Sequence, residues 1–203
     1  MIRSTFIFLL FFILTSCSSK VQFSDPSCPK ISIAKTKINV TDAENIRSCD
    51  MAAEAEVAQQ CQIAWRLALA HKEPQAMSIL NKLAIKYPRM STIDLMIGQV
   101  EEYSGKNDEA VKYFQKSVKN CEFSSLRLFK LANSLMNSNR PKEALVYYNK
   151  LIERIPKFAP AHLGVAKALS QMHSNDKARI NKELSIVLEI EPDNSEAKTM
   201  MAK

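Results

Sequence analysis

The three histidines are the first candidates for acid–base or metal chemistry, and none of them belongs to a recognisable motif. His71, His162 and His173 are widely spaced, and no His-Glu-x-x-His helix is present. The sequence also has no nucleophile elbow, no P-loop and no paired Cys-x-x-Cys ligands. A histidine without a partner motif is more often a surface or packing residue than a catalytic one. We therefore predict no enzymatic activity, no catalytic residue, no metal site and no bound cofactor.

A cysteine near the N-terminus lies in a setting that predicts covalent modification. A short basic start, Met1-Ile2-Arg3, precedes an apolar run from Phe6 to Leu14, and Thr15-Ser16-Cys17 follows directly. This order is typical of an export signal, and the apolar run is far shorter than the roughly 20 residues that cross a bilayer.

The quartet Leu14-Thr15-Ser16-Cys17 resembles the lipobox of bacterial lipoproteins. The resemblance implies cleavage before Cys17, diacylglycerol on its sulfur and an acyl chain on its new amino group, and several acyl chains anchor a protein stably. Ser18, in place of Asp, resembles the sorting pattern of lipoproteins sent to the outer membrane. We therefore expect a signal peptide at 1–16 and a lipid-anchored protein that faces the periplasm, with this lipid as its only added group.

Residues 17–40 are predicted to be the lipidated cysteine and a flexible tether. The stretch contains Pro26, Pro29 and several Ser and Lys residues, and it has no helical periodicity. Fully extended, it would span about 75 Å at roughly 3.3 Å per residue. The alternative is that its apolar residues form a short strand or pack on the first helices: Ile31, Ile33, Ile38 and Val40.

Four further cysteines make an even number in an exported chain and predict two disulfides: Cys28, Cys49, Cys61 and Cys121. Cys49 and Cys61 would lie about 18 Å apart along one helix, beyond the bridging limit of about 7 Å. Two connectivities remain open. One joins Cys28 to Cys49 and Cys61 to Cys121, and the other joins Cys28 to Cys61 and Cys49 to Cys121. Buried free thiols are the alternative, because cysteine is also a common core residue.

The composition favours helices. Only three glycines occur in 203 residues, whereas Ala, Leu, Lys, Glu, Met and Asn are abundant, which argues against a glycine-using sandwich, barrel or nucleotide-binding fold. The formal net charge is +7, but the acids are interleaved with the bases, so nucleic-acid binding is not expected. The modest excess suits a protein that rests near anionic lipid headgroups. We predict an all-α protein with one folded domain.

A period of 34 residues organises most of the chain. It places small residues in one column at Ala76, Ala110, Ala144 and Ala178. A second small column contains Ala64, Gly98, Ala132 and Ala166, and a large position contains Leu80, Phe114 and Tyr148. These columns resemble the tetratricopeptide repeat (TPR). The resemblance implies a right-handed superhelix, or α-solenoid, of about four helical hairpins with capping helices.

Several positions depart from the family pattern. The usual Trp or Leu column contains Gln60, Asp94, Leu128 and His162, of which only Leu128 conforms. Repeat two has Glu101 where an aromatic residue or Leu is expected. Repeat four fits through Ala178 and then carries two extra residues.

The same frame predicts the element boundaries. An N-terminal capping helix region is expected at 41–56, a TPR domain at 57–194 and a polar capping helix at 195–203. The repeats fall near 57–90, 91–124, 125–158 and 159–194. The first helices of the hairpins should begin near Asp50, Ser91, Ser125 and Ala159, and their partners near Glu73, Asn107, Pro141 and Asp176. Capping helices cover the open ends of such arrays.

The resemblance also implies where a partner binds, because TPR proteins generally use the concave surface lined by the first helix of each hairpin. In this frame the predicted groove is largely apolar and contains Trp65, Leu69, Leu95, Gln99, Tyr103, Phe129, Asn133, Met136, Leu163 and Lys167. An amphipathic helix or an extended apolar peptide should therefore fit better than a C-terminal carboxylate. The alternative is that Trp65 or Phe129 packs against the tether or the last helix of the chain.

The lipobox and the repeats together resemble TPR pilotins and the TPR lipoprotein of Flp (tight-adherence) pilus systems. The resemblance implies a scaffold that helps a secretin or pilus complex to form in the outer membrane. An adaptor that docks peptidoglycan enzymes or proteases is the second hypothesis, and a small hydrolase, which no residue supports, is the third. TPR motifs determine packing and not the partner, so the sequence does not decide between the first two.

Overall fold

The computed structural model describes residues 40–121, 124–173 and 175–202 of the chain, with side chains from residue 53 onward. Within these ranges every regular element is an α-helix and no strand occurs. The prediction of an all-α fold is confirmed. The predicted signal peptide and almost all of the predicted tether lie outside the described residues.

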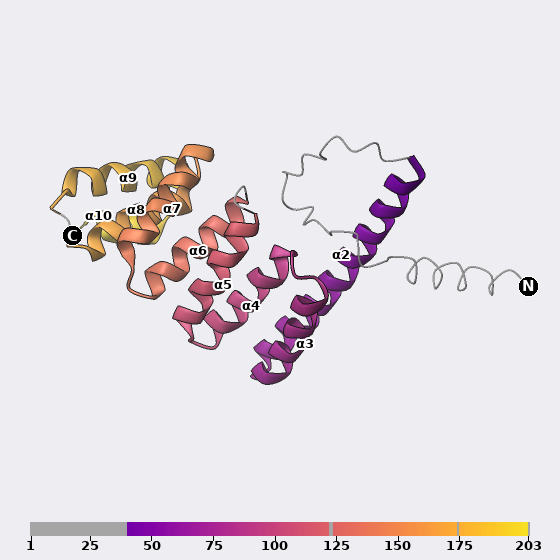
Figure 1. Cartoon of the computed structure of the whole chain (residues 1–203). Helices are drawn as coiled ribbons and strands as arrows, with labels where there is room; N and C mark the ends of the chain where they lie inside the picture. The colour runs from indigo at the N-terminus through magenta and orange to yellow at the C-terminus, as the bar shows by residue number, and fades with distance from the viewer. Residues whose placement is uncertain (1–39, 122–123, 174, 203) are drawn as a thin grey trace, which may run out of the picture.

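In the described part of the chain, nine helices form four antiparallel hairpins and a terminal helix. The helices are α2 (Val40–Leu69), α3 (Glu73–Lys86), α4 (Ser91–Tyr103), α5 (Asn107–Asn120), α6 (Ser125–Asn137), α7 (Pro141–Arg154), α8 (Ala159–Gln171), α9 (Lys177–Ile190) and α10 (Ser195–Met201). Consecutive helices pack on one another, so the hairpins stack in a row from α2 to α10 (Figure 1). The predicted starts of α3 to α8 coincide with the observed ones.

Small residues let the two helices of a hairpin approach closely. Ala76, Ala110 and Ala144 are fully buried, as the repeat frame predicts. At Gly98 a Cβ would lie 2.7 Å from the ring of Phe114, so glycine allows this ring to reach the backbone of α4. The core extends along the whole stack, with one cluster over α2 to α4, a second over α4 to α8 and a third over α8 to α10.

The turn inside each hairpin holds a residue in the left-handed backbone conformation, and these residues are 34 apart. They are His71, Gly105, Asn139 and His173, with φ values of 57°, 78°, 55° and 51°. A left-handed residue after a helix lets the next N–H bond back to an open carbonyl, as Lys106 N does to Glu101 O at 2.9 Å. Two of the three isolated histidines therefore hold turn positions.

The two extra residues of repeat four lie before Ala178 and not after it. His173 still takes the left-handed turn position, but α9 begins at Lys177, two residues later than the period requires. Ala178 is exposed, whereas Ile180 packs against the core. The prediction that Ala178 is the small packing residue is wrong. Because two residues are inserted in the preceding turn, Ala178 keeps the 34-residue spacing in the sequence but does not face the core.

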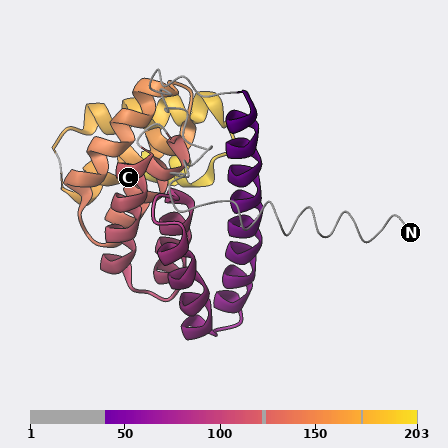
Figure 2. The same ribbon diagram turned by 45° about the vertical axis from the view of Figure 1, so that its right-hand side comes forward.

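The predicted N-terminal boundary is also corrected. We expected a separate capping helix at 41–56 and a repeat helix near Asp50, but α2 runs without a break from Val40 to Leu69. The segment contains no Gly or Pro and is rich in Ala, Glu and Gln, which favour a helix. The C-terminal part of α2 packs on α3, and its N-terminal part extends beyond the end of α3 (Figure 1, Figure 2).

Polar residues that depart from the family pattern are buried and paired. Asp94 is 2% exposed and accepts hydrogen bonds from Lys116 Nζ at 2.7 Å and Asn120 Nδ2 at 3.3 Å. His162 has Glu183 Oε2 at 2.6 Å from its Nδ1 and Pro156 O at 2.9 Å from its Nε2. Which ring nitrogen donates depends on the tautomer of His162. These pairs join α4 to α5 and α8 to α9 where the family uses apolar contacts.

The cysteines differ from both predicted connectivities. Cys61 is a free, buried thiol, whereas each connectivity places it in a disulfide. Cys121 is disulfide-bonded. Cys28 lies outside the described residues, and the side chain of Cys49 is not among those described. The prediction that Cys61 forms a disulfide is wrong, because it packs among the apolar residues of α2 to α4.

The end of the array is covered by α10. The side chain of Asn194 accepts a hydrogen bond from Ala197 N at 2.9 Å and so caps this helix. Ala197 is fully buried against Leu184 and Val187 of α9. The prediction of a terminal capping helix is confirmed. No described helix is long and apolar enough to cross a membrane.

Candidate ligand groove

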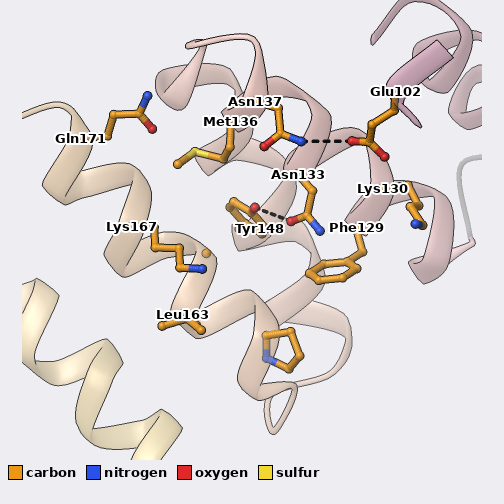
Figure 3. Close-up of a pocket in the computed structure, with 12 residues that line it drawn as sticks. Glu102, Phe129, Lys130, Asn133, Met136, Asn137, Tyr148, Leu163, Lys167 and Gln171 are labelled. Atoms are coloured by element: carbon orange, nitrogen blue, oxygen red, sulfur yellow. Dashed lines mark hydrogen bonds between the residues drawn. The ribbon is translucent and has the colours of Figure 1, made fainter. Parts of the chain in front are cut away.

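A groove of about 580 Å³ lies across the first helices of repeats two to four, within the usual size of ligand pockets. We call it the α6–α8 groove, because most of its lining comes from these two helices (Figure 3). It is lined by Glu102, Phe129, Lys130, Asn133, Met136, Asn137, Tyr148, Pro160, Leu163, Gly164, Lys167 and Gln171.

The floor of the groove is built around Tyr148 of α7. This residue is 2% exposed, and its ring lies against Gly164 of α8, where a Cβ would come within 2.4 Å of it. Its hydroxyl donates a hydrogen bond of 2.6 Å to Asn133 Oδ1 (Figure 3). Burial raises the pKa of the Tyr148 phenol, so the hydroxyl stays protonated and remains a donor. The Nδ2 group of Asn133 is left as a donor with no hydrogen-bond partner among the described residues.

The walls of the groove combine fixed aromatic and flexible apolar side chains. Phe129 makes edge-to-face contacts with Tyr148 and Phe158, at ring-centre distances of 6.5 and 5.3 Å. Such contacts hold a ring in one orientation. Met136 and Leu163 are half-buried, and the flexible Met136 can adapt to a bound apolar side chain.

Charged and amide groups stand at the rim of the groove. Asn137 Nδ2 donates to Glu102 Oε1 at 3.1 Å, and Gln171 Nε2 donates to Asn139 Oδ1 at 2.8 Å. Lys167 Nζ pairs with Glu196 of α10 at 2.8 Å. Lys130 has no ion-pair partner within the described residues. The groove is therefore not largely apolar as predicted, because polar side chains contribute to its lining about as much as apolar ones. A mixed lining of this kind suits an amphipathic peptide better than a small charged ligand.

The structure brings together five of the ten predicted groove residues. Phe129, Asn133, Met136, Leu163 and Lys167 all line the α6–α8 groove. Half of the predicted set therefore forms one site in the second half of the solenoid.

The other five predicted residues do not line this groove. Trp65 and Tyr103 contact each other edge to face at 5.6 Å, and His71 lies 6.2 Å from Tyr103. Leu69 is exposed and Gln99 is half-buried. Leu95 is buried in the core cluster of α4 to α8, so its assignment to an accessible groove is wrong. Phe129 and Leu163 hold the same position in the next two repeats and are only half-buried.

Sequence reasoning missed seven lining residues, and the repeat frame could have found several of them. Asn137 and Gln171 are 34 and 68 residues after Tyr103, and Glu102 is 34 before Met136. Extending each predicted column through all repeats would therefore have added these three. Tyr148 had no such signal, because it belongs to a second helix and reaches the groove only where Gly164 has no side chain.

The remaining site predictions fall elsewhere. Cys17, the predicted lipidation site, lies outside the described residues. Among the residues that the structure describes, no three His, Cys, Asp or Glu side chains gather where they could hold a metal ion.

Two stretches of the sequence match models of the tetratricopeptide repeat, at residues 95–122 and 128–157. These stretches contribute much of the α6–α8 groove. These two stretches therefore match the tetratricopeptide repeat, and the chain folds as a TPR solenoid.

Several solved structures share this fold. YrrB, described as a TPR protein with an unusual peptide-binding site, is 18% identical over 70% of this chain and 72% of its own, with a TM-score of 0.61. MamA from Desulfovibrio magneticus RS-1 is 14% identical over 71% and 80%, with a TM-score of 0.64. The first TPR of Spaghetti (RPAP3), bound to the HSP90 peptide SRMEEVD, is 19% identical over 55% and 87%, with a TM-score of 0.52. No curated protein sequence matches the chain.

Proposed function

We propose that this protein is a non-enzymatic scaffold that binds a segment of a partner protein in the α6–α8 groove. The observation that carries the proposal is the groove itself, which offers Phe129, Met136 and Leu163 as apolar contacts and the Nδ2 group of the half-buried Asn133 as a donor. Spaced apolar anchors over a trough are the arrangement that receives an amphipathic helix or an extended apolar peptide. The peptide-binding TPR proteins of similar fold support this assignment.

The location and pathway rest on the N-terminal sequence. The resemblance of Leu14-Thr15-Ser16-Cys17 to a lipobox supports a lipid anchor on Cys17, and Ser18 supports transfer to the outer membrane, facing the periplasm. The combination of lipobox and TPR array supports a role in the assembly of a pilus or secretin complex. An adaptor that docks peptidoglycan enzymes or proteases is the alternative. A secretin gene and a pilus ATPase gene beside this one would favour assembly, and cell-wall hydrolase genes would favour the adaptor.

Site-specific photocrosslinking tests the groove. A photoreactive amino acid replaces Met136 or Leu163 in the full chain, and the matched control position is Ile85, which is 83% exposed on the other helix layer of the first hairpin. In the native host, illumination should give one discrete crosslinked product from the groove positions and none from Ile85.

A product from Ile85 but from neither groove position would refute the groove as the binding site. Circular dichroism of each variant must show an unchanged helical signal, because Met136 and Leu163 are half-buried and their replacement could disturb packing. Mass spectrometry of the crosslinked product identifies the partner and thereby separates the assembly role from the adaptor role.

A further inference from the structure

The second helices of successive hairpins run in the same direction, so the C-terminal ends of α3, α5 and α7 share one edge of the solenoid. Basic residues gather at this edge, and all of them are exposed: Lys82, Lys86, Arg89, Lys116, Lys119, Lys150, Arg154 and Lys157. We call this surface the basic edge.

The repeat itself places part of this charge in a row. Lys82, Lys116 and Lys150 are 34 residues apart and hold the same position in α3, α5 and α7. Glu56 pairs with Lys86, and Asp94 pairs with Lys116, while Glu153 is exposed in the same region. Lys82, Lys119, Lys150 and Lys157 have no ion pair within the described residues. The edge therefore keeps a positive excess.

The opposite edge and the end of α9 do not share this excess. At the opposite edge the first turns of α3, α5 and α7 contain acids, and basic residues pair with them: Lys106 with Glu73, Lys112 with Glu109 and Arg140 with Glu143. The end of α9 has Glu189 and Glu191 and no basic residue in its last turn. Helix dipoles favour bases in a last turn, but Lys82, Lys116 and Lys150 lie before the last turn and Lys157 lies after it. The dipole alone does not explain the row.

A hollow beside this row is large enough for a headgroup phosphate. It has a volume of about 270 Å³ between α2 and α3, and it is lined by Glu56, Gln60, Ile79, Lys82, Leu83 and Lys86. The Lys86 ammonium is held by Glu56 at 2.7 Å. The Lys82 ammonium is available to an anion.

The long helix α2 relates the basic edge to the N-terminal part of the chain. Glu56 contacts Lys86 and Tyr87 at the end of α3, so residues 40–55 of α2 continue past the basic edge (Figure 2). The chain that leads to Cys17 is therefore joined to the solenoid on the side of the basic edge. One end of the groove lies on the opposite side of the solenoid from the basic edge. Its residues are at the C-terminal ends of α4, α6 and α8: Glu102, Asn137 and Gln171.

We propose that the basic edge rests on the anionic phospholipid headgroups of the membrane that holds the lipid anchor. This inference rests on the proposed anchor at Cys17. The anchor confines the domain to the surface, where each nearby lysine strengthens contact with an anionic leaflet. Docking in this way orients the solenoid so that the end of the α6–α8 groove with Glu102, Asn137 and Gln171 is the end farther from the membrane.

Lysine labelling tests this orientation on the full chain. The protein is incorporated into vesicles of phosphatidylcholine alone or of phosphatidylcholine mixed with phosphatidylglycerol, acetylated with a water-soluble reagent and analysed by mass spectrometry. Lys82, Lys119, Lys150 and Lys157 should be acetylated several-fold more slowly in the mixed vesicles, and added salt should abolish the difference. Lys72 and Lys142, exposed on the opposite edge, are the matched controls and should be unchanged.

Equal labelling of both lysine sets in the two kinds of vesicle would overturn the proposal. Replacing the four edge lysines with Gln should remove the slowing at Lys86, whereas Gln at Lys72, Lys142, Lys177 and Lys182 should not. If the protein fails to float with neutral vesicles, the anchor is wrong. In that case, flotation with anionic vesicles would still support the basic edge if the edge substitutions abolish this flotation. A protein that does not float with anionic vesicles either would refute the basic edge.

Discussion

The hydroxyl of Tyr148 donates a 2.6 Å hydrogen bond to Asn133 Oδ1 and so connects the core of repeat three to the floor of the α6–α8 groove. The bond fixes the Asn133 amide and leaves its Nδ2 group for a ligand. Replacing Tyr148 with Phe keeps the ring and removes the bond. We expect the free energy of unfolding to fall by about 1 kcal/mol, measured by urea denaturation, and crosslinking from Met136 to weaken.

Tyr147→Phe is the matched control for this substitution, because Tyr147 is a half-buried neighbour with no hydrogen bond from its hydroxyl within the described residues. Equal effects of the two substitutions on stability and crosslinking would contradict a special role of the Tyr148 hydroxyl.

Gly164→Ala should destabilise the fold through a steric clash. The added Cβ would lie 2.4 Å from the Tyr148 ring, and overpacking of this kind costs about 1–3 kcal/mol. The measurement is the midpoint of thermal unfolding. Combining Gly164→Ala with Tyr148→Leu should cost less than the sum of the two single changes, because the smaller side chain relieves the clash. Strictly additive losses would show that the ring does not limit position 164.

The pair between Asp94 and Lys116 predicts that a double variant is more stable than a single variant. Lys116→Met leaves the buried Asp94 carboxylate without its cation, and we expect a loss of about 1–2 kcal/mol, since the 52% exposure of the lysine side chain weakens the pair. Asp94→Leu together with Lys116→Met places at position 94 the apolar kind of residue that the TPR pattern has there. This double variant should recover most of the loss. Urea denaturation of the unchanged protein and of both variants measures it. A double variant less stable than Lys116→Met alone would contradict the argument.

Cys61 should resist alkylation in the folded protein. Burial raises the pKa of its thiol to about 11, so at about pH 8 very little reactive thiolate is present. Iodoacetamide should modify Cys61 only after denaturation, and Cys121 only after denaturation and reduction, since it is disulfide-bonded. Peptide mass spectrometry under these three conditions distinguishes the two residues. A cross-linked peptide that contains Cys61 would restore one of the two connectivities predicted from the sequence.

Cys17→Ala tests the proposed anchor. Without the sulfur that the lipobox presents, the protein should remain uncleaved or without lipid, and it should no longer fractionate with the outer membrane. Ser18→Ala provides the comparison, because it alters the neighbouring residue and leaves the acceptor in place. Unchanged fractionation of the Cys17→Ala protein would refute the anchor.

The repeat frame accounts for what the sequence predicted correctly. Ala76, Ala110 and Ala144 keep a constant spacing because each hairpin buries the same face against its neighbours, so the period is visible without coordinates. The same constraint places Phe129, Asn133 and Met136 on one helix face, because residues three and four apart share a face. The sequence therefore determines the helices, their order and part of the groove.

Other features depend on distances that no local pattern encodes. Ala178 fits the column and yet is exposed, since an insertion in one turn leaves the small-residue pattern unchanged. The Tyr148 ring reaches the floor of the groove only because Gly164, which belongs to the next repeat, has no side chain where the ring lies. Cys61 remains free because its surroundings are core residues of α2 to α4. The sequence by itself determines which residues repeat, whereas packing between repeats decides which side chains are covered, because burial depends on neighbours that lie far apart along the chain.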